Sequence, residues 1–325
     1  MTIKQIYDLA IEMGTENDLR GKKQVGKMLA RLKKKYEKLD KDKKKEFDKE
    51  RLTNPYSDTR ILNDPSANSR QAKKPIKKIL TGIDIGVGEL LLAKELGDID
   101  LIISHHPLGN ALVGLDDVMK LQADVLNLYG IPINVAESLI HLRIEEVGRG
   151  LSPINHNRVV DAAKLLNIGL MCSHTTSDNC VANFLKKLIN KKQPEYIEDL
   201  MGILKSIPEY KQAIKIGAGP RLFTGKPENH CGKIVLTEIT GGTEGAPEIY
   251  QYMAQAGIGT VVAMHMSEKH YEEAKKSHIN VVVAGHISSD SLGMNLFLDE
   301  LSKKGIKIVT CSGLTRVERF KKSKK

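Results

Sequence analysis

The chain has 325 residues, a formal net charge of +10, 41% hydrophobic residues, four cysteines and no tryptophan. This length predicts two domains, or one large domain with an insertion. The sequence contains no apolar run long enough to cross a bilayer, no signal-peptide pattern and no CxxC pair, so we expect a cytoplasmic protein that keeps its thiols reduced and does not contact a membrane.

The positive charge is concentrated at the two ends of the chain. Residues 1–80 carry 22 basic and 12 acidic side chains, and residues 316–325 carry six basic and one acidic. Residues 81–315 carry 22 basic and 27 acidic side chains, which is a net charge of −5. A mildly acidic body is compatible with metal binding and argues against a nucleic-acid groove that runs through it.

Residues 1–75 are expected to form a basic helical extension followed by a linker. Residues 3–13 have the pattern of a short amphipathic helix, and the Lys-rich stretch 22–51 has apolar side chains at helical spacing. We interpret this stretch as a solvated helix face or a helical hairpin on the body, with contact to nucleic acid or an anionic surface as the alternative. Residues 53–76 are rich in Asn, Pro, Ser and Asp and predict an extended linker.

The body alternates short apolar runs with helical patterns. Strands are predicted at 79–85, 99–104, 131–136, 168–173, 233–239, 258–264, 279–284 and 306–310. Helices are predicted at 88–96, 117–129, 178–190, 245–256, 267–277 and 290–304. This alternation predicts an α/β fold of two parallel-rich halves with helices on both faces. The predicted division is a first half at 76–190, an intervening segment at 191–232, a second half at 233–315 and a basic tail at 316–325.

Histidines follow four of the predicted strands: His105 and His106, His174, His265, and His286. Because the carboxyl ends of parallel strands line one crevice, we expect these side chains to converge. Asp178 and Asp290 come four residues after His174 and His286, and a helix that began at these points would place each pair on one face. Imidazoles and carboxylates that meet in this way suit a divalent transition metal.

The candidate metal ligands are His105, His106, Asp178, His286 and Asp290. His174 is either a further ligand or a residue that orients one. The set is too large for one tetrahedral zinc and predicts two divalent ions about 3.5–4 Å apart, which could be zinc, manganese, iron, nickel or cobalt. A single histidine at a strand end more often caps a turn, and the aspartates could be favourable helix N-terminal charges, so the prediction depends on the whole set.

At these residues the sequence resembles the NIF-three-like family of dinuclear metal-centre proteins, whose members are commonly described as GTP cyclohydrolase I type 2 homologues. The matching segments are LIISHHPL (101–108), SHTTSD (173–178) and VVVAGHISSD (281–290). Residues 80–100 and 264–280 also fit the family pattern.

The resemblance implies the NIF-three-like fold, metal ligands at the five candidate positions, and a toroidal homohexamer whose metal sites face an interior cavity. The family usually has glutamate where this chain has Asp290. Aspartate is shorter by one methylene, about 1.5 Å, which leaves open whether Asp290 bridges both ions or binds one. Residues 1–75 and 130–158 are not typical of the family, and its usual Trp-Asp-Asn segment is missing.

The leading functional hypothesis is a metal-dependent hydrolase that acts on a small polar or phosphorylated, nucleotide-like substrate. His265, Glu268 and His270 are the candidates for the general acid and base. A GTP ring-opening activity is implied only by the resemblance. The glycine-rich segment 241–245 could hold a substrate phosphate or be a plain turn. The alternatives are a metal-binding regulator, carrier or scaffold without turnover, and a nucleic-acid binder that uses residues 22–51.

Overall fold

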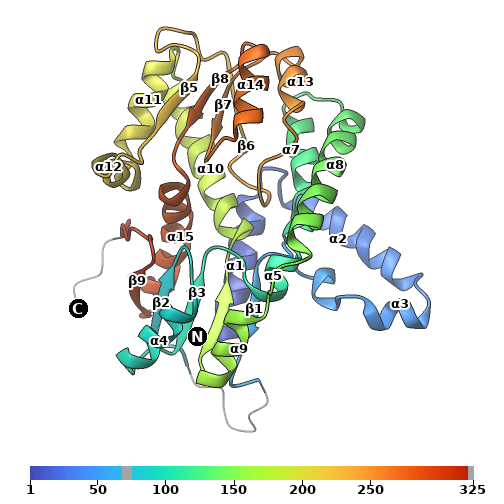
Figure 1. Cartoon of the computed structure of the whole chain (residues 1–325), viewed down its shortest axis with the longest axis vertical. Coiled ribbons are helices and arrows are strands. Elements are labelled where there is room, and N and C mark those ends of the chain that lie inside the picture. The colour runs from blue at the N-terminus through green and yellow to red at the C-terminus, as the bar shows by residue number, and fades with distance from the viewer. Residues whose placement is uncertain (68–74, 321–325) are drawn as a thin grey trace.

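The computed structural model describes residues 1–67 and 75–320, which form two β-sheets flanked by helices (Figure 1). Part of the predicted linker and the last five residues of the predicted basic tail lie outside the described residues. The mixed α/β architecture with two mainly parallel sheets confirms the predicted fold class. Within the described residues, no helix has both the length and the apolar character that a membrane span requires.

The first sheet has the strand order β1-β4-β3-β2-β9. Its strands are β1 (Arg60–Asn63), β2 (Lys78–Gly82), β3 (Leu101–Ser104), β4 (Gly169–Cys172) and β9 (Lys307–Cys311). The inner pairs are parallel, and β1 lies antiparallel to β4 at one edge. Every residue of β3 and β4 is buried, because helices cover both faces of the parallel core.

The second sheet repeats this plan with the order β5-β8-β7-β6. Its strands are β5 (Arg221–Thr224), β6 (Lys233–Glu238), β7 (Ile258–Ala263) and β8 (Asn280–Val283). The strands β6, β7 and β8 are parallel, and β5 is an antiparallel edge strand. In both sheets, therefore, the carboxyl ends of the central strands share one edge.

The described helices have the following bounds: α1 (Ile3–Asn17), α2 (Lys22–Glu37), α3 (Lys41–Glu46), α4 (Val87–Leu96), α5 (Gly109–Val113), α6 (Leu115–Val118), α7 (Lys120–Leu128), α8 (Ile133–Leu151), α9 (Arg158–Leu166), α10 (Thr175–Lys192), α11 (Ile197–Ser206), α12 (Pro208–Lys215), α13 (Ile249–Gln255), α14 (Glu268–Lys276) and α15 (His286–Lys303). A short 3-10 helix covers Lys49–Leu52.

The long helices α10 and α15 lie between the two sheets and connect them (Figure 1). Helix α10 follows β4 of the first sheet, and α15 leads from β8 of the second sheet to β9 of the first. The two helices approach closely near their N-terminal ends, where a Cβ atom added to Gly293 would lie 2.4 Å from the carbonyl oxygen of Ser177. Glycine at this position allows the two first turns to lie side by side.

The N-terminal segment is predicted to be a basic extension, but parts of it belong to the packed body of the protein. Helix α1 buries Ile6 in the core of the first sheet, and a Cβ atom added to Gly14 would lie 2.7 Å from Thr176 of α10. The predicted linker contains the edge strand β1. Only the Lys-rich α2 and α3 project from the body (Figure 1), and Val25 is the one buried residue of α2.

Three further predictions about secondary structure need correction. The strand predicted at 131–136 is instead the start of α8, because the apolar positions continue at helical spacing and bury Ala136 and Ile140. The sequence analysis predicts no strand or helix in the intervening segment 191–232, but this segment contains α11, α12 and the edge strand β5. Strand β9 was assigned to the second half, but it pairs with β2 in the first sheet, because α15 carries the chain back across the molecule.

We predict that Gly293→Ala lowers the free energy of unfolding by about 1–3 kcal/mol, because the added methyl group would overlap Ser177 and separate α10 from α15. The matched control is Gly202→Ala on α11, where a Cβ atom meets nothing within 4 Å. That variant is expected to be neutral, or more stable by up to about 1 kcal/mol. Urea unfolding of both variants tests the prediction, and equal stabilities would contradict it.

Candidate metal centre

The sequence-predicted ligands come from three strand ends that meet where α10 and α15 begin. His105 and His106 directly follow β3, and Asp178 lies in the first turn of α10 after β4. His286 and Asp290 lie one turn apart at the start of α15, which follows β8 of the other sheet. The centre is thus assembled from both sheets.

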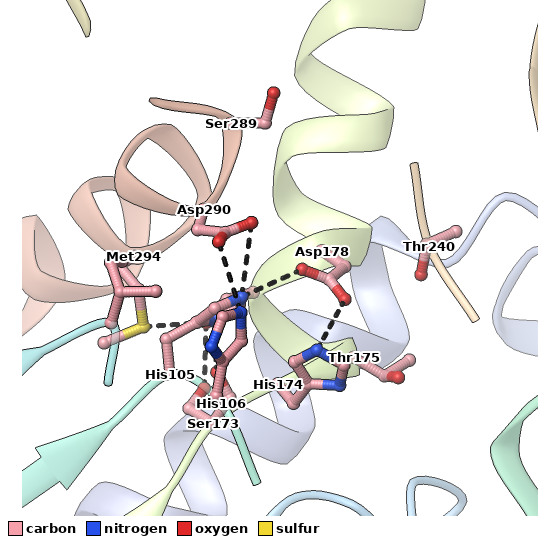
Figure 2. A network of polar contacts seen from close by, with 12 residues as sticks. His105, His106, Ser173, His174, Thr175, Asp178, Thr240, Ser289, Asp290 and Met294 are labelled. Carbon is pink, nitrogen blue, oxygen red and sulfur yellow. Dashed lines mark hydrogen bonds and ion pairs between the residues drawn. The ribbon is translucent and has the colours of Figure 1, made fainter. Parts of the chain in front are cut away.

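All five predicted ligands converge. The Nε2 atom of His105 lies 3.5 Å from Oδ1 of Asp178 and 3.5 Å from Oδ1 of Asp290. The other oxygen of Asp290, Oδ2, lies 3.5 Å from Nε2 of His106 and 3.6 Å from Nε2 of His286. Figure 2 shows the labelled members of this group pointing toward one another. Asp290 therefore lies at the middle of the cluster, with Oδ1 toward His105 and Oδ2 toward His106 and His286.

The imidazole rings are oriented by contacts at their far nitrogens. In three of them Nδ1 meets an oxygen atom: the carbonyl of Ser173 at 3.0 Å from His105, the carboxylate of Asp84 at 2.7 Å from His106, and the carboxylate of Asp58 at 2.7 Å from His174. Because a carbonyl oxygen only accepts hydrogen bonds, His105 must carry its proton on Nδ1. Its Nε2 then faces the centre, which is the arrangement of a metal-binding histidine.

The buried polar atoms at the centre lack other partners. Among the described residues, no hydrogen-bond partner exists for Nε2 of His105, Oδ1 of Asp178 or either carboxylate oxygen of Asp290. Polar atoms buried without a partner are costly, and native proteins nearly always satisfy them. One or more cations would satisfy this whole set, so the buried histidine and aspartate groups fit a metal ion.

Comparisons with known proteins agree with this architecture. No protein-family model matches the chain, and no curated protein does. The crystal structure of a NIF3 superfamily protein from Sphaerobacter thermophilus matches with a TM-score of 0.70 and 21% sequence identity, over 97% of this chain and 99% of that chain. The chain has the NIF3 fold. This confirms the fold that the sequence resemblance implied, and the coverage brings most of residues 1–75 into it.

Two other solved structures are more distant. Reduced HcgD from Methanocaldococcus jannaschii matches with a TM-score of 0.49 and 16% identity, over 77% of this chain and 90% of that chain. The protein ybgI, of unknown function, matches with a TM-score of 0.45 and 16% identity, over the same shares of the two chains.

The charges at the centre of this NIF3-fold chain strongly influence one another. Burial raises the pKa of Asp178 to about 6. Burial also acts to raise the pKa of Asp290, but the nearby imidazoles, above all that of His105, hold it well below its usual range. Burial lowers the pKa of His286 to about 4, so this ring is neutral at pH 7 and its nitrogen lone pair is available. The centre therefore presents a permanent carboxylate next to a neutral imidazole.

Asp58 is a site residue that the sequence analysis missed. It is fully buried, and its Oδ2 accepts hydrogen bonds from Nδ1 of His174 and, at 2.6 Å, from the hydroxyl of Thr175. The neighbouring Thr59 accepts from the backbone N–H of His174 at 3.1 Å. The missed signal was the apolar pair Ile61–Leu62 of β1 just after this segment, because the pairing of β1 with β4 places Asp58 beside the histidine that follows β4.

Two of the three predicted acid–base candidates, His265 and His270, approach the same carboxylate, Glu244, with Nδ1 at 3.1 Å and 3.5 Å, whereas Glu268 lies apart from them. The ring of His265 lies 4.9 Å from that of His286, measured between centroids, and its Nδ1 lies 3.1 Å from the carboxylate of Glu244. His270 is buried, with its nitrogens engaged by Ser267 and the carbonyl of Gly245, so it supports the 241–245 loop. A first hollow lies beside the centre and is lined by Asp178, Asp290 and His265, among others. Glu268 is exposed on α14 and does not line this hollow.

The glycine-rich segment 241–245 positions Glu244, which the sequence analysis had not singled out. Gly241 and Gly242 have φ angles of 98° and 91°, and Nε2 of Gln122 donates to the carbonyl oxygens of Gly241 and Thr243. These contacts hold the segment as a tight turn. The hydrogen bond to His265 leads the interactions that lower the pKa of Glu244 to about 2, against the opposing effect of its burial.

We predict that Asp58→Asn lowers the pKa of His174 in metal-free protein. Burial alone would lower this pKa, but the attraction of Asp178 and the hydrogen bond that His174 donates to Asp58 raise it to about 9. Nuclear magnetic resonance titration of chelator-treated protein measures the change, with Asp161→Asn on the surface of α9 as the control. An unchanged His174 titration would contradict the assignment.

The same variant has a defined effect on stability. Because the pKa of His174 is raised on folding, the protonated ring stabilises the fold fully below pH 6.5, and this stabilisation is lost as the pH rises through about 9. Asp58→Asn should therefore cost about 1–3 kcal/mol near neutral pH and less above pH 9. Chemical unfolding at several pH values measures both quantities.

Proposed function

We propose that the chain holds two divalent metal ions bridged by Asp290. His105, Asp178 and Asp290 would bind one ion, and His106, His286 and Asp290 would bind the other. The observation that carries the proposal is the division of the two Asp290 oxygens between these groups, at 3.5 Å and 3.5–3.6 Å from the imidazole nitrogens. The aspartate thus already reaches both groups in spite of its shorter side chain.

The donor set narrows the class of metal. It consists of imidazole nitrogens and carboxylate oxygens, and none of the four cysteines belongs to the donor groups found among the described residues. Such nitrogen and oxygen donors suit zinc, manganese, iron, nickel or cobalt, and cellular availability selects among them. His174 would complete the centre, either as a further donor or by neutralising Asp178, which lies 3.8 Å from its Nε2.

We further propose that the centre hydrolyses a small polar or phosphorylated substrate, such as a nucleotide. Two divalent ions would activate water for attack at neutral pH and polarise the bond that is cleaved. His265 stands next to His286 and is held by Glu244, whose hydrogen bond and negative charge overcome the effect of burial and raise the pKa of the imidazole. A proton held on His265 is then available for the leaving group.

The proposal includes two kinds of partner, further copies of this chain and a nucleic acid. A homohexamer with metal sites that face an interior cavity is supported by the sequence resemblance. A nucleic-acid partner would use the projecting helix α2, where lysine and arginine side chains are exposed.

The metal assignment predicts a different metal content for each variant. Wild-type protein should contain about two equivalents of metal, His286→Ala and Asp178→Asn about one each, and Asp290→Asn fewer than either, because both ions would lose a ligand. Elemental analysis of purified protein measures this directly. His141→Ala, which removes an exposed histidine paired with Glu145 on α8, is the matched control and should retain both equivalents.

A decisive comparison is the double variant His105→Ala/His286→Ala, which removes one ligand from each proposed group. Metal content equal to that of the wild type would end the assignment. Thermal unfolding of each variant distinguishes a lost metal from a lost fold, because a correctly folded variant keeps a cooperative transition after chelation.

The hydrolase proposal predicts a loss of turnover without a loss of metal. His265→Gln should lower kcat by about 10²–10⁴-fold on any substrate whose leaving group needs a proton, while metal content stays unchanged. A panel of nucleotides and phosphate esters, assayed with metal-loaded protein, supplies the substrate. If no member of a broad panel is hydrolysed while metal changes the binding of another molecule, the chain is a metal-dependent regulator or carrier instead.

A further inference from the structure

A second hollow adjoins the proposed metal centre on the side of His265 and His286. It has a volume of about 300 Å³, and both histidines line it, of which His286 is also a proposed metal ligand. Its other walls come from the turn at 217–219, the edge strand β5, and the residues that follow β7. The volume is at the lower end of the range for ligand pockets and suits a small molecule.

Two side chains of β5 give the hollow its chemistry. Arg221 and Phe223 both line the hollow, and both are exposed. The guanidinium of Arg221 donates to the carbonyl oxygen of Gly217, which fixes its position in the wall. None of the described residues that line the hollow is acidic, so the positive charge of Arg221 is not opposed within it.

The remaining lining is apolar and adaptable. Met264 and Met266 flank His265, and Val283 at the end of β8 lies opposite β5 in the pairing. An exposed phenylalanine beside two methionines offers a planar contact surface with flexible neighbours, which suits a flat organic group. The hollow therefore has an apolar wall, one cation, and an end formed by His265 and the proposed metal ligand His286.

Backbone geometry joins the hollow to the metal centre. Gly285, the residue before His286, has a φ angle of 108°, and a Cβ atom added to it would lie 2.9 Å from the carbonyl oxygen of Ala218. The turn at 217–219 thus packs on the backbone that starts α15. The same close contact positions both the wall of the hollow and a proposed metal ligand.

We propose that this hollow is the substrate-recognition pocket of the proposed hydrolase, and that it takes a small oxyanion with a planar apolar body. The oxyanion, a phosphate or a carboxylate, pairs with Arg221, since guanidinium groups bind such anions with two parallel hydrogen bonds. The planar body lies against Phe223 and Met266, and the reactive group faces His265 and His286. The part of this inference that concerns a reaction rests on the proposed function, whereas the part that concerns binding does not.

Isothermal titration calorimetry with phenyl phosphate tests the pocket, in both chelator-treated and metal-loaded protein. Inorganic phosphate, which lacks the ring, and benzoate, which carries a carboxylate, are titrated in parallel. Arg221→Gln should weaken phenyl phosphate binding about tenfold or more. Phe223→Ala should weaken it by up to about tenfold and leave inorganic phosphate unchanged.

The matched controls are Arg158→Gln and Leu165→Ala on α9, whose side chains are exposed away from the hollow. Both should bind the probes as the wild type does. Weaker binding of benzoate in the Arg221 variant supports the pocket equally, and the relative affinities of the two aromatic probes identify the preferred oxyanion.

Three outcomes would overturn the pocket. These are no binding of either aromatic probe, binding that neither β5 variant changes, and binding that requires metal and is insensitive to Arg221. If light scattering shows that the β5 variants alter the oligomeric state of a protein that binds no probe, the hollow is a subunit contact. Binding to chelator-treated protein does not depend on hydrolysis, so a failed activity assay alone leaves the pocket standing.

Discussion

The structure depends on the burial of two carboxylates, Asp178 and Asp290, in the first turns of neighbouring helices. Their oxygens at the centre have no hydrogen-bond donors among the described residues. The N-terminal ends of α10 and α15 favour negative charge, but helix dipoles alone cannot offset the desolvation of two anions a few ångströms apart. Positive charge must therefore come from elsewhere. Protonated imidazoles supply it in the metal-free protein, and metal ions would supply more.

This requirement explains why the fold brings both sheets to one point. Helix α15 contributes side chains to the cores of both sheets, and α10 contributes to the core of the second sheet, so packing along both helices sets the distance between their first turns. Gly293 permits the close approach, and Gly14 lets α1 support α10 from behind. A site built on long packed helices keeps its donors in place better than one built on free loops would.

The surroundings become less polar with distance from the two carboxylates, in the direction of His265 and β5. Oriented imidazoles surround Asp290, the pair of His265 and Glu244 lies next, and the apolar hollow with Arg221 lies beyond. His286 touches all three zones, because it belongs to the proposed metal centre, meets the ring of His265 edge to face and lines the hollow. Its neutral state at pH 7 follows from burial and makes it a ligand that a cation can use directly.

Local patterns in the sequence were enough to predict most of the parallel strands, the fold class and the convergence of five candidate ligands. Continuous apolar runs and residues at strand ends have meanings that do not depend on distant contacts. They could not identify Asp58, whose role arises only when β1 pairs with β4 across more than 100 residues. They also misassigned β9 and the start of α8, since pairing partners and helical continuation are decided by packing. The amino-acid sequence by itself determined which residues could bind a metal. Tertiary structure decided which of them meet, because convergence requires two helices from different sheets to touch.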